Sequence, residues 1–408
     1  MTYYQLNNMQ NNLPISDFLY VGTNELSDAD ICISKTLRTY LNNTKTEIDT
    51  YYAMWDRIKK ITNPYEYIHT QVPGYKISIS KHKPLSRSFF KFIEIATTFN
   101  LTADFEKDKS FSSFHLAEGP GGFIEALVSL RKKDTDKYYG MTLLNNDVNV
   151  PGWHKSQHFL SKNSNVMIEK GINQNGDLLD PDNLDSIHDK YKNSMSIVTG
   201  DGGFDFSIDF NQQEATSAKL LFAQICYAIL LQKQGGHFVL KVFDTFSKSS
   251  VEMMYILSMF YENIFVIKPC TSRYANSERY VVCKKFRFES TSHFLPIFKK
   301  ILREMTSFTF VKSLLTCKMP YLFVSRMEEI NSIFGQQQLE TIVYTLSLIQ
   351  NNNNKDIEHK IEQIIASNVQ KCCSWCIKHG IFYNKLITNT RVYNNEKKEM
   401  TDISHSFF

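Results

Sequence analysis

The stretch His115–Leu127, with the sequence HLAEGPGGFIEAL, decides the fold. It reads as the end of an apolar strand, a glycine-rich turn and the start of a helix. In an open parallel sheet, ligands bind beyond the carboxyl ends of the strands, where such turns lie. The turn has neither the GxGxxG pattern of dinucleotide sites nor the terminal Lys-Ser/Thr of a phosphate loop. We therefore expect it to hold another adenosine-containing ligand, and a tight turn without a ligand remains the alternative.

Apolar runs and amphipathic helices alternate around this stretch, from about residue 81 to 287. The segments with a strand pattern are 111–117, 138–144, 165–172, 194–200, 237–243, 263–270 and 277–283. The segments with a helical pattern are 86–99, 121–133, 213–234 and 248–261. This alternation predicts a doubly wound α/β fold. The last two strands are joined by too few residues for a helical crossover, so they should pair antiparallel and give a mixed seven-stranded sheet.

The regions on either side lack this alternation, which divides the chain into 1–80, 81–287 and 288–408. In the first region, apolar residues recur at helical spacing between Leu37 and Ile58, which predicts a mostly helical N-terminal extension. The last region contains the helical patterns 292–305, 322–350 and 357–379. We therefore expect a mostly helical C-terminal region without further strand–helix alternation.

The composition is that of an ordinary soluble protein, with 42% hydrophobic and 22% charged residues. A net charge of +4 permits a polyanionic partner without demanding one. The eight cysteines are scattered, which favours a reducing compartment. The first residues do not resemble a signal peptide, and the absence of an 18-residue apolar run argues against a membrane span.

Four motifs in this order resemble the FtsJ-type ribose 2′-O-methyltransferases. They are SRSFFKFIEI (86–95), EGPGGF (118–123), VTGDGGFD (198–205) and HFVLKVF (237–243), and KPCTSRYANSERYVVCK (268–284) extends the likeness. The last stretch is especially similar to cap ribose methyltransferases of eukaryotes and viruses, including large cytoplasmic DNA viruses. The resemblance covers half of the chain and implies a Rossmann-like core that uses S-adenosylmethionine. It reaches neither 1–80 nor 288–408.

The family's catalytic tetrad is Lys-Asp-Lys-Glu, and the resemblance assigns it to Lys91, Asp201, Lys241 and Glu278. A ribose hydroxyl is a weak nucleophile, whereas a sulfonium methyl is already activated and needs no metal. The enzyme must therefore align the reacting atoms and remove a proton. A lysine serves as base when burial and a second ammonium lower its pKa. We expect Lys241 to be the base, oriented by Asp201 and Lys91, with Glu278 holding the lysine pair.

The resemblance also implies a cofactor site. It consists of the turn Glu118, Gly119, Pro120, Gly121, Gly122 and Phe123, together with Asp177 and Asp201. In the family, an aspartate at the place of Asp177 contacts the adenine amine, and a carboxylate is a suitable acceptor. Asp201 should lie near the methionine part. An acidic contact to the ribose is expected after the second strand, and Asp147 is the nearest candidate.

Basic residues near the tetrad are candidates for RNA contact. Arg87 lies in the basic segment 81–91 and Arg273 lies in TSRYANSE, and either could bind phosphates, although such charges are more often solvated. Cys372, Cys373, Cys376 and His379 have a spacing that suggests zinc, but a single helix does not easily surround a tetrahedral ion. We therefore predict core thiols and no metal site.

The leading hypothesis is a ribose 2′-O-methyltransferase that modifies the first or second nucleotide of capped mRNA. One alternative is a methyltransferase for ribosomal or other structured RNA, and another is a catalytically silent scaffold of the same fold. The C-terminal region 288–408 could bind a protein partner. The viral resemblance suggests the cytoplasm as the location, with a virion or a viral replication site included.

Overall fold

The computed structural model describes residues 2–6, 13–27, 30–108, 110–144, 152–203, 210–351 and 355–385. They form a sheet of eight strands and a separate sheet of two. Across the main sheet the order is β1 (Tyr3–Leu6), β8 (Tyr261–Ile267), β9 (Arg279–Phe286), β7 (Gln232–Val242), β6 (Met195–Gly200), β3 (Ser112–Leu116), β4 (Lys137–Met141) and β5 (Val166–Ile168). From β5 to β7 all neighbours are parallel, whereas β9 is antiparallel to both β7 and β8.

All seven predicted strands are present, and the antiparallel pairing of the last two is confirmed by the partners Phe265 and Val282. The sheet nevertheless has eight strands because β1, from the region predicted to be a helical extension, pairs with β8. The register of this pair runs from Tyr3 opposite Ile267 to Leu6 opposite Ile264. With only four residues, β1 is too short to show a recognisable strand pattern in the sequence.

Both faces of the sheet are covered, which explains why its strands are continuous apolar runs. On one face pack α3 (Ser88–Thr98), α4 (Gly122–Arg131) and α5 (Gln157–Lys162), and on the other α6 (Pro181–Tyr191), α7 (Gln213–Leu231) and α8 (Lys248–Phe260). Successive side chains of a strand point to opposite faces. Accordingly, Val198 and Leu240 belong to the core beneath α7 and α8, while Ile197 and Val239 belong to the core beneath α3 and α4.

The helix α7 is long and apolar enough to cross a membrane by length and composition. Within the protein, however, 78% of its most apolar window is buried. The core helix of a soluble protein has the same character.

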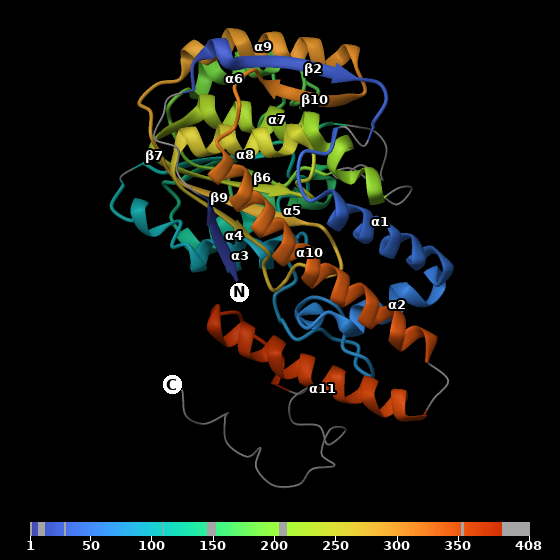
Figure 1. The fold of residues 1–408 in the computed structure, drawn as a ribbon. Helices are drawn as coiled ribbons and strands as arrows, with labels where there is room; N and C mark the ends of the chain where they lie inside the picture. The colour runs from blue at the N-terminus through green and yellow to red at the C-terminus, as the bar shows by residue number, and fades with distance from the viewer. Residues whose placement is uncertain are drawn as a thin grey trace.

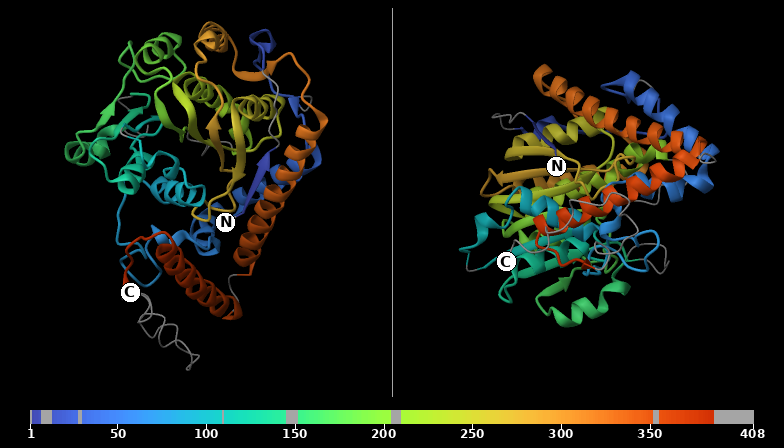
Figure 2. Two further views of the ribbon diagram at one scale, coloured as in Figure 1. Left: turned by 90° about the vertical axis from the view of Figure 1, so that its left-hand side faces the viewer. Right: turned by 90° about the horizontal axis from the view of Figure 1, so that it is seen from below.

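The flanking regions pack together along the side of the sheet. Their elements are β2 (Phe18–Thr23), α1 (Lys35–Thr50) and α2 (Tyr52–Thr62) from the N-terminal part, and α9 (Leu295–Glu304), β10 (Phe310–Leu315), α10 (Tyr321–Gln350) and α11 (Lys355–Lys378) from the C-terminal part. The long helix α10 lies against α1 and α2, and α11 contacts α2 at the far end (Figures 1 and 2). The helices α1, α2, α10 and α11 of the two extensions therefore pack together beside the sheet.

The predicted helices of 288–408 are confirmed, and the region also contains a strand that the sequence did not indicate. The strand β10 pairs antiparallel with β2, from Phe310 opposite Thr23 to Leu315 opposite Phe18. The two strands are nearly 300 residues apart in sequence, so their pairing leaves no local signal. This small sheet ties the beginning of the chain to the C-terminal region above α7 and α8 (Figure 1).

Candidate active site

The strand order reverses at β3, which has β4 on one side and β6 on the other. At such a point the connections leave in opposite directions and open a crevice beyond the carboxyl ends of the strands. The turn Glu118–Phe123 follows β3, Asp201 follows β6, and Lys241 lies near the end of β7. The topology thus places the residues of three predicted motifs at one edge of the sheet.

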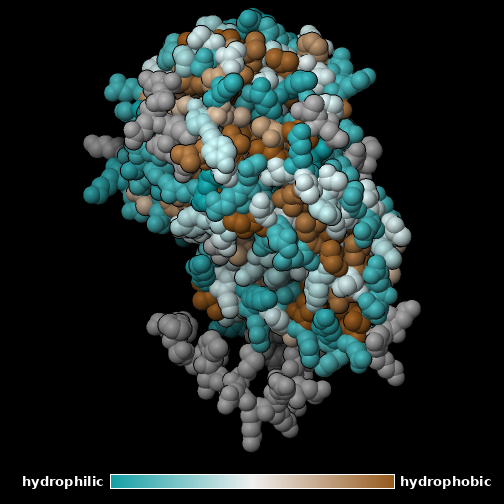
Figure 3. Space-filling model, in the orientation of Figure 1, coloured by the Kyte–Doolittle hydropathy of each residue, from teal (hydrophilic) through white to brown (hydrophobic). Residues whose placement is uncertain are grey.

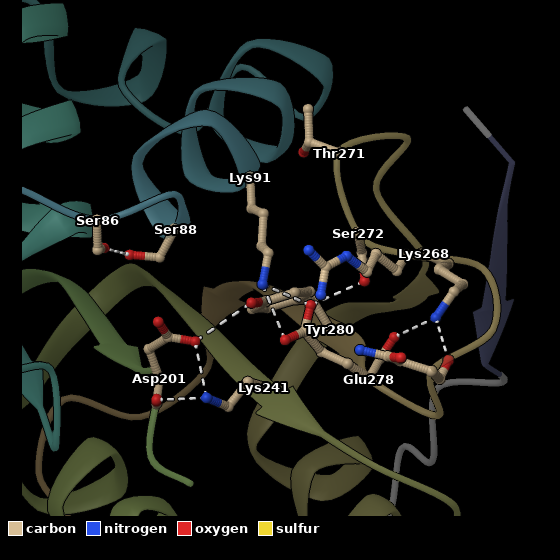
Figure 4. Close-up of polar contacts among 12 residues, drawn as sticks. Ser86, Ser88, Lys91, Asp201, Lys241, Lys268, Thr271, Ser272, Glu278 and Tyr280 are labelled. Carbon is tan, nitrogen blue, oxygen red and sulfur yellow. Dashed lines mark hydrogen bonds and ion pairs between the residues drawn. The ribbon is translucent and has the colours of Figure 1, made fainter. Parts of the chain in front are cut away.

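Lys91 and Glu278 meet at this edge in a buried ion pair. The Lys91 Nζ atom lies 2.7 Å from Glu278 Oε1 and 2.8 Å from Oε2, and the lysine side chain is only 5% exposed. Figure 4 shows Lys91 pointing from α3 toward Glu278, which precedes β9. Burial lowers the pKa of Lys91, although Glu278 opposes this change. Burial alone would raise the pKa of Glu278, but Lys91, Lys241 and Arg87 hold it well below its usual range.

Lys241 and Asp201 form the second half of the tetrad. The Lys241 ammonium donates a hydrogen bond of 2.6 Å to the backbone oxygen of Asp201 and lies 3.2 Å from its Oδ1. The Tyr280 hydroxyl donates to the same Oδ1 at 3.2 Å, and Lys91 Nζ lies 6.0 Å from the centre of the Tyr280 ring. Tyr280 therefore lies between the two ion pairs (Figure 4). The structure brings all four predicted tetrad residues together.

The loop that carries Glu278 is fixed by buried charges. Glu94 of α3 accepts hydrogen bonds from the backbone of Cys270 at 2.8 Å and of Thr271 at 3.1 Å. The Lys268 ammonium donates to the carbonyls of Asn276 at 2.5 Å and Glu278 at 2.7 Å. Each of these contacts replaces hydration that the loop loses on burial. The loop is consequently held on both sides of the Glu278 carboxylate.

Arg273 has a partner within the protein. Its guanidinium donates to Glu66 through Nε at 2.9 Å and Nη2 at 2.5 Å, and the Glu66 side chain is fully buried. Burial alone would raise the pKa of Glu66, but Arg273 lowers it to about 2. Arg273, which was predicted to contact RNA, therefore also anchors the Glu278 loop to Glu66. Arg87 is half-buried and its charge acts on Glu278, which places it close to the tetrad.

Two side chains of the glycine-rich turn are bound within the protein. The Glu118 carboxylate accepts hydrogen bonds from the backbone of Phe123 and Ile124 at the start of α4 and lies 3.0 Å from the buried His115. The Phe123 ring is fully buried. These two side chains are thus occupied within the protein, which leaves the backbone of the turn for a cofactor. Gly121 has a φ of +100°, a conformation that favours glycine.

The geometry agrees with the family that the sequence matches. The profile of the family described as FtsJ-like methyltransferase matches residues 84–286. Residues 84–286 are an FtsJ-like methyltransferase domain. This range contains the whole tetrad, the glycine-rich turn and Asp177, and it begins close to the predicted boundary at residue 81.

Curated relatives of the FtsJ-like domain are cap methyltransferases. The Homo sapiens cap-specific mRNA (nucleoside-2′-O-)-methyltransferase 1 is 37% identical over 190 residues, or 44% of this chain and 22% of that protein. The Danio rerio methyltransferase 2 of the same description is 29% identical over 339 residues, or 77% of this chain and 43% of that protein. An inactive methyltransferase 1B of Caenorhabditis briggsae is 32% identical over 48% of this chain and 24% of that protein. The chain therefore spans less than half the length of these relatives.

Among solved structures, human methyltransferase-like protein 13 in complex with SAH has a TM-score of 0.33 and 10% identity. The match covers 54% of this chain and 90% of that chain.

The cofactor of FtsJ-like methyltransferases is S-adenosylmethionine, and the loop after β5 fits its adenosine part. This loop packs against the end of β4, where Leu144 donates a hydrogen bond of 2.7 Å to the carbonyl of Asn175. A side chain at Gly176 would come within 2.0 Å of the Thr142 carbonyl oxygen, so only glycine allows this approach. Asp177 is partly exposed, and its Oδ1 accepts from Leu179 at 2.9 Å. One oxygen of this carboxylate is thus engaged by the backbone that follows it, and Asp147 lies outside the described residues.

The cysteines of α11 belong to the core. Cys372 and Cys376 are fully buried, and Cys373 is 8% exposed. Burial raises the pKa of Cys373 to about 11 and that of Cys376 to about 12. Nowhere in the part of the chain that the structure describes do three His, Cys, Asp or Glu residues gather as they would around a metal ion. His379 instead contacts Thr97 at 2.9 Å.

A cavity of about 360 Å³ lies directly beside the tetrad. Glu278 and Phe243 line it, and Lys241 Nζ lies 5.9 Å from the centre of the Phe243 ring. Its other walls come from α1, α2, the loop after Arg273 and Gln338 of α10. Both extensions of the FtsJ-like domain thus contribute to a site that opens onto the reacting residues.

Sequence reasoning missed several residues of this site. Tyr280 was read only as part of a strand, Lys268 and Ser272 only as part of a motif, and Gln338 as an ordinary helix residue. Ser272 donates a hydrogen bond of 2.8 Å to Glu278 Oε1. Lys268, which directly follows the apolar end of β8, was the one available signal, because a buried lysine requires polar partners.

Proposed function

We propose that this protein is an S-adenosylmethionine-dependent RNA ribose 2′-O-methyltransferase that acts on the 5′ end of capped mRNA. The observation that carries the proposal is the buried cluster of Lys91, Asp201, Lys241 and Glu278 at the sheet edge of an FtsJ-like domain. The names of the curated relatives support the capped substrate. The match to the Danio rerio protein supports a shared organisation because it extends into the regions outside 84–286.

The cluster suits proton removal from a weak nucleophile. The bound cofactor supplies an activated methyl group on a sulfonium sulfur. Lys241 would take the proton of the ribose 2′-hydroxyl as that oxygen accepts the methyl group. Asp201 holds the Lys241 Nζ atom at two points, so the base does not have to be ordered during the reaction.

The Lys91–Glu278 pair provides the second part of the mechanism. The Lys91 ammonium lies in the same buried cluster as Lys241. Glu278 compensates one ammonium and fixes its position. The Tyr280 hydroxyl holds Asp201 from the other side. Each residue thus has a role in positioning or in proton transfer.

We further propose that Arg87 binds a phosphate of the RNA next to the methylated ribose. It is half-buried beside the tetrad and lies at the start of α3, which also carries Lys91. Arg273 is paired with Glu66 but also lines the cavity, so its contact with RNA would add to an anchoring role. Phosphate contacts of this kind position a strand without reading its sequence.

A catalytically silent scaffold is the main alternative, and one relative is described as inactive. The complete tetrad in ion-pair geometry speaks against silence in this chain. A methyltransferase for structured RNA would need no cavity beside the tetrad, whereas both extensions build one here. We also propose that the protein acts in the cytoplasm, which imaging of the tagged protein in its host tests.

A protein partner of 288–408 is also proposed. Tyr321 and Leu322 at the start of α10 are 80% and 70% exposed, and Phe382 is 84% exposed. In the orientation of Figure 3 the surface is mostly hydrophilic and is interrupted by hydrophobic patches. Affinity capture with the wild type and with the double variant Tyr321→Ser/Leu322→Ser tests this proposal. A partner that binds at this helix end should be captured by the wild type and lost with the variant.

The proposed activity is tested by methyl transfer from labelled S-adenosylmethionine to capped RNA, followed by digestion to nucleosides. The expected product is a 2′-O-methylated nucleoside next to the cap. Label on a base, or on internal nucleotides only, would contradict the proposal. The variant Lys241→Ala is the negative control because it removes only the proposed proton acceptor.

A further inference from the structure

The strands β7 and β9 bring Lys241 and Glu278 to the active site, and their ladder ends beside these two residues. Lys241 lies opposite Tyr280, and the last pair of the register is Val242 with Arg279. Glu278 directly precedes β9, which begins at Arg279. Backbone pairing of the two strands therefore ends one residue beyond Lys241 and does not include Glu278.

The side chain of Asn331, from α10, joins the two ends where the ladder stops. Its Oδ1 atom accepts hydrogen bonds from Arg279 Nη1 at 3.0 Å and from the Thr245 hydroxyl at 2.8 Å. Its Nδ2 atom donates a hydrogen bond of 2.8 Å to the backbone carbonyl of Thr245. The whole residue is buried. A single amide of the C-terminal region thus binds both the chain that follows β7 and the first residue of β9.

Buried charges meet at the same place. Arg279 Nη2 lies 3.6 Å from Asp244 Oδ1, and neither atom has a hydrogen-bond partner among the described residues. Lys45 of α1 lies 3.0 Å from Asp244 Oδ2. Burial alone would raise the pKa of Asp244, but Lys45 and Arg279 hold it below its usual range. The N-terminal extension therefore contributes a lysine to this point, and the C-terminal region contributes the amide.

The orientation of the Asn331 amide is determined by its partners. Turning it over would place its NH₂ group against the Arg279 guanidinium, where only donors would meet. The hydrogen bond to Asn331 is shorter than the contact with Asp244, and Arg279 Cζ lies 5.0 Å from the centre of the Phe334 ring, also on α10. A buried charge that loses its hydrogen bond is costly. Removal of the amide should therefore shift Arg279 and the start of β9.

Such a shift would reach the tetrad through the neighbours of Arg279 in the chain. Glu278 precedes it, and Tyr280 follows it and donates a hydrogen bond to Asp201 (Figure 4). Successive side chains of a strand point to opposite faces, so Arg279 acts from the face opposite to that of Tyr280. A displacement of about 1 Å in an active site can cost about 100-fold in rate. The contacts of Arg279 are consequently able to affect the rate without touching a substrate.

We propose that Asn331 is a positioning residue for methyl transfer, which aligns Lys241 with Glu278 by holding the ends of β7 and β9 together. The inference rests on the proposed function and deepens it by giving the C-terminal region a part in aligning the tetrad. Asn331 lies outside the FtsJ-like domain of residues 84–286. It acts through Arg279 and Thr245 and contacts neither the cofactor nor the RNA.

The test compares two exchanges of the same kind in the full chain. Asn331→Leu keeps the approximate volume of the side chain and removes the hydrogen bonds to Arg279 and Thr245. The control is Asn368→Leu, at a buried asparagine of α11 that donates a hydrogen bond of 2.7 Å to the carbonyl of Ile61. Single-turnover methyl transfer at saturating concentrations, cofactor affinity and the KM for capped RNA are measured. Amide hydrogen exchange, followed by mass spectrometry, reports on the strand ends independently of activity.

Asn331→Leu should lower the single-turnover rate about 10- to 100-fold, because the reacting groups are no longer aligned. Its cofactor affinity and its KM for RNA should stay within about 3-fold of the wild type, since no ligand contact is lost. Amide exchange should become faster in the peptides that contain Val242 and Arg279. Asn368→Leu should show the wild-type rate at saturation and unchanged exchange in these two peptides.

A milder variant keeps the test valid if Asn331→Leu does not fold, which a thermal unfolding curve shows. Thr245→Val has nearly the same shape and removes only the hydroxyl that donates to Asn331. Its single-turnover rate should fall about 3- to 10-fold, as expected for one hydrogen bond. A wild-type rate in folded Thr245→Val would then overturn the proposal.

The remaining outcomes separate the positioning role from the proposed function. A folded Asn331→Leu protein with the wild-type single-turnover rate, or with a loss confined to KM or cofactor affinity, would show that Asn331 has a purely structural role. An equal loss of rate in Asn368→Leu would also overturn the assignment. If the wild type transfers no methyl group to capped RNA, the proposed function fails. Faster exchange at both strand ends of Asn331→Leu would then still support the connection, and unchanged exchange would refute it.

Discussion

Lys241 and Asp201 are joined at two points, since the Lys241 Nζ atom lies 2.6 Å from the backbone oxygen of Asp201 and 3.2 Å from its Oδ1. Tyr280 donates a hydrogen bond to the same Oδ1. The lysine is therefore fixed by the residue that follows β6, at the carboxyl edge where the crevice opens. A base that is already oriented in this way loses little freedom when the ribose hydroxyl arrives.

The first prediction concerns this lysine. Lys241→Ala should abolish methyl transfer while S-adenosylmethionine binding stays within a few-fold of the wild type, because the change removes the proton acceptor and leaves the cofactor turn intact. Lys241→Arg should be inactive as well, since a guanidinium does not act as a base. Single-turnover assays and calorimetry measure the two quantities. Substantial turnover of Lys241→Ala at neutral pH would refute the assignment.

The second prediction concerns the Lys91–Glu278 pair and stability. Removing one partner of a buried pair leaves an uncompensated charge, so Glu278→Gln should lower the free energy of unfolding by about 3–5 kcal/mol. Lys91→Met/Glu278→Gln should be less destabilised than the sum of the single variants. The pair of Arg326 with the exposed Glu329 provides the control, where Glu329→Gln should cost at most about 0.5 kcal/mol. Denaturant unfolding measures all variants, and equal costs for the two pairs would contradict the buried-pair interpretation.

The third prediction separates cofactor binding from helix capping. Asp177→Ala should weaken S-adenosylmethionine binding about 10-fold, because it removes the expected acceptor for the adenine amine. Asp180 is the matched control, since its carboxylate caps α6 through Asp182 at 2.9 Å. Asp180→Ala should reduce stability by about 1 kcal/mol without changing cofactor affinity. Calorimetric titration of both variants decides the matter, and an unchanged affinity in Asp177→Ala would remove that residue from the site.

The seven core strands could be predicted from sequence because they depend on local signals, and the tetrad could be assigned because its motifs resemble those of a known family. Apolar runs mark the buried strands, and the tetrad residues lie in motifs at strand ends or on α3. The pairing of β10 with β2 was missed because its two strands are distant in the chain. The contribution of β1 to the main sheet was missed because it is only four residues long.

Side-chain partners could not be predicted from the sequence either, because many of them are distant in the chain. The sequence indicates that Arg273 is basic and close to Glu278, but not that Glu66, more than 200 residues away, occupies its guanidinium. Likewise, the sequence places Glu118 at the cofactor turn, whereas the structure uses its carboxylate to cap α4. Charge and position thus predicted the location of the site, and tertiary packing determined which groups remain available to a ligand.

The fourth prediction concerns Lys268 and pH. Burial lowers the pKa of Lys268 from 10.5 to about 7, although Glu278 opposes the shift. Between these two values the unfolded chain binds a proton that the folded protein has lost, so this residue makes stability rise with pH from about 7 toward 10.5. The difference in unfolding free energy between the wild type and Lys268→Met should therefore increase by up to about 1.4 kcal/mol per pH unit in that window. Denaturant unfolding between pH 6 and about 9.5 measures it, and a difference independent of pH would show that Lys268 has an ordinary pKa.

The fifth prediction concerns the substrate. A flexible 5′ end offers little shape for recognition, so an anchored cap must supply the binding energy that aligns one ribose with Lys241. Methyl transfer to a short capped RNA should therefore exceed transfer to the same uncapped RNA by at least about 10-fold in kcat/KM. Raising the salt concentration should weaken binding of both RNAs, and Arg87→Gln should reduce the slope of log Kd against log salt by about one because one phosphate contact is lost. Equal rates for the two RNAs, or a preference for folded ribosomal fragments, would favour the structured-RNA alternative.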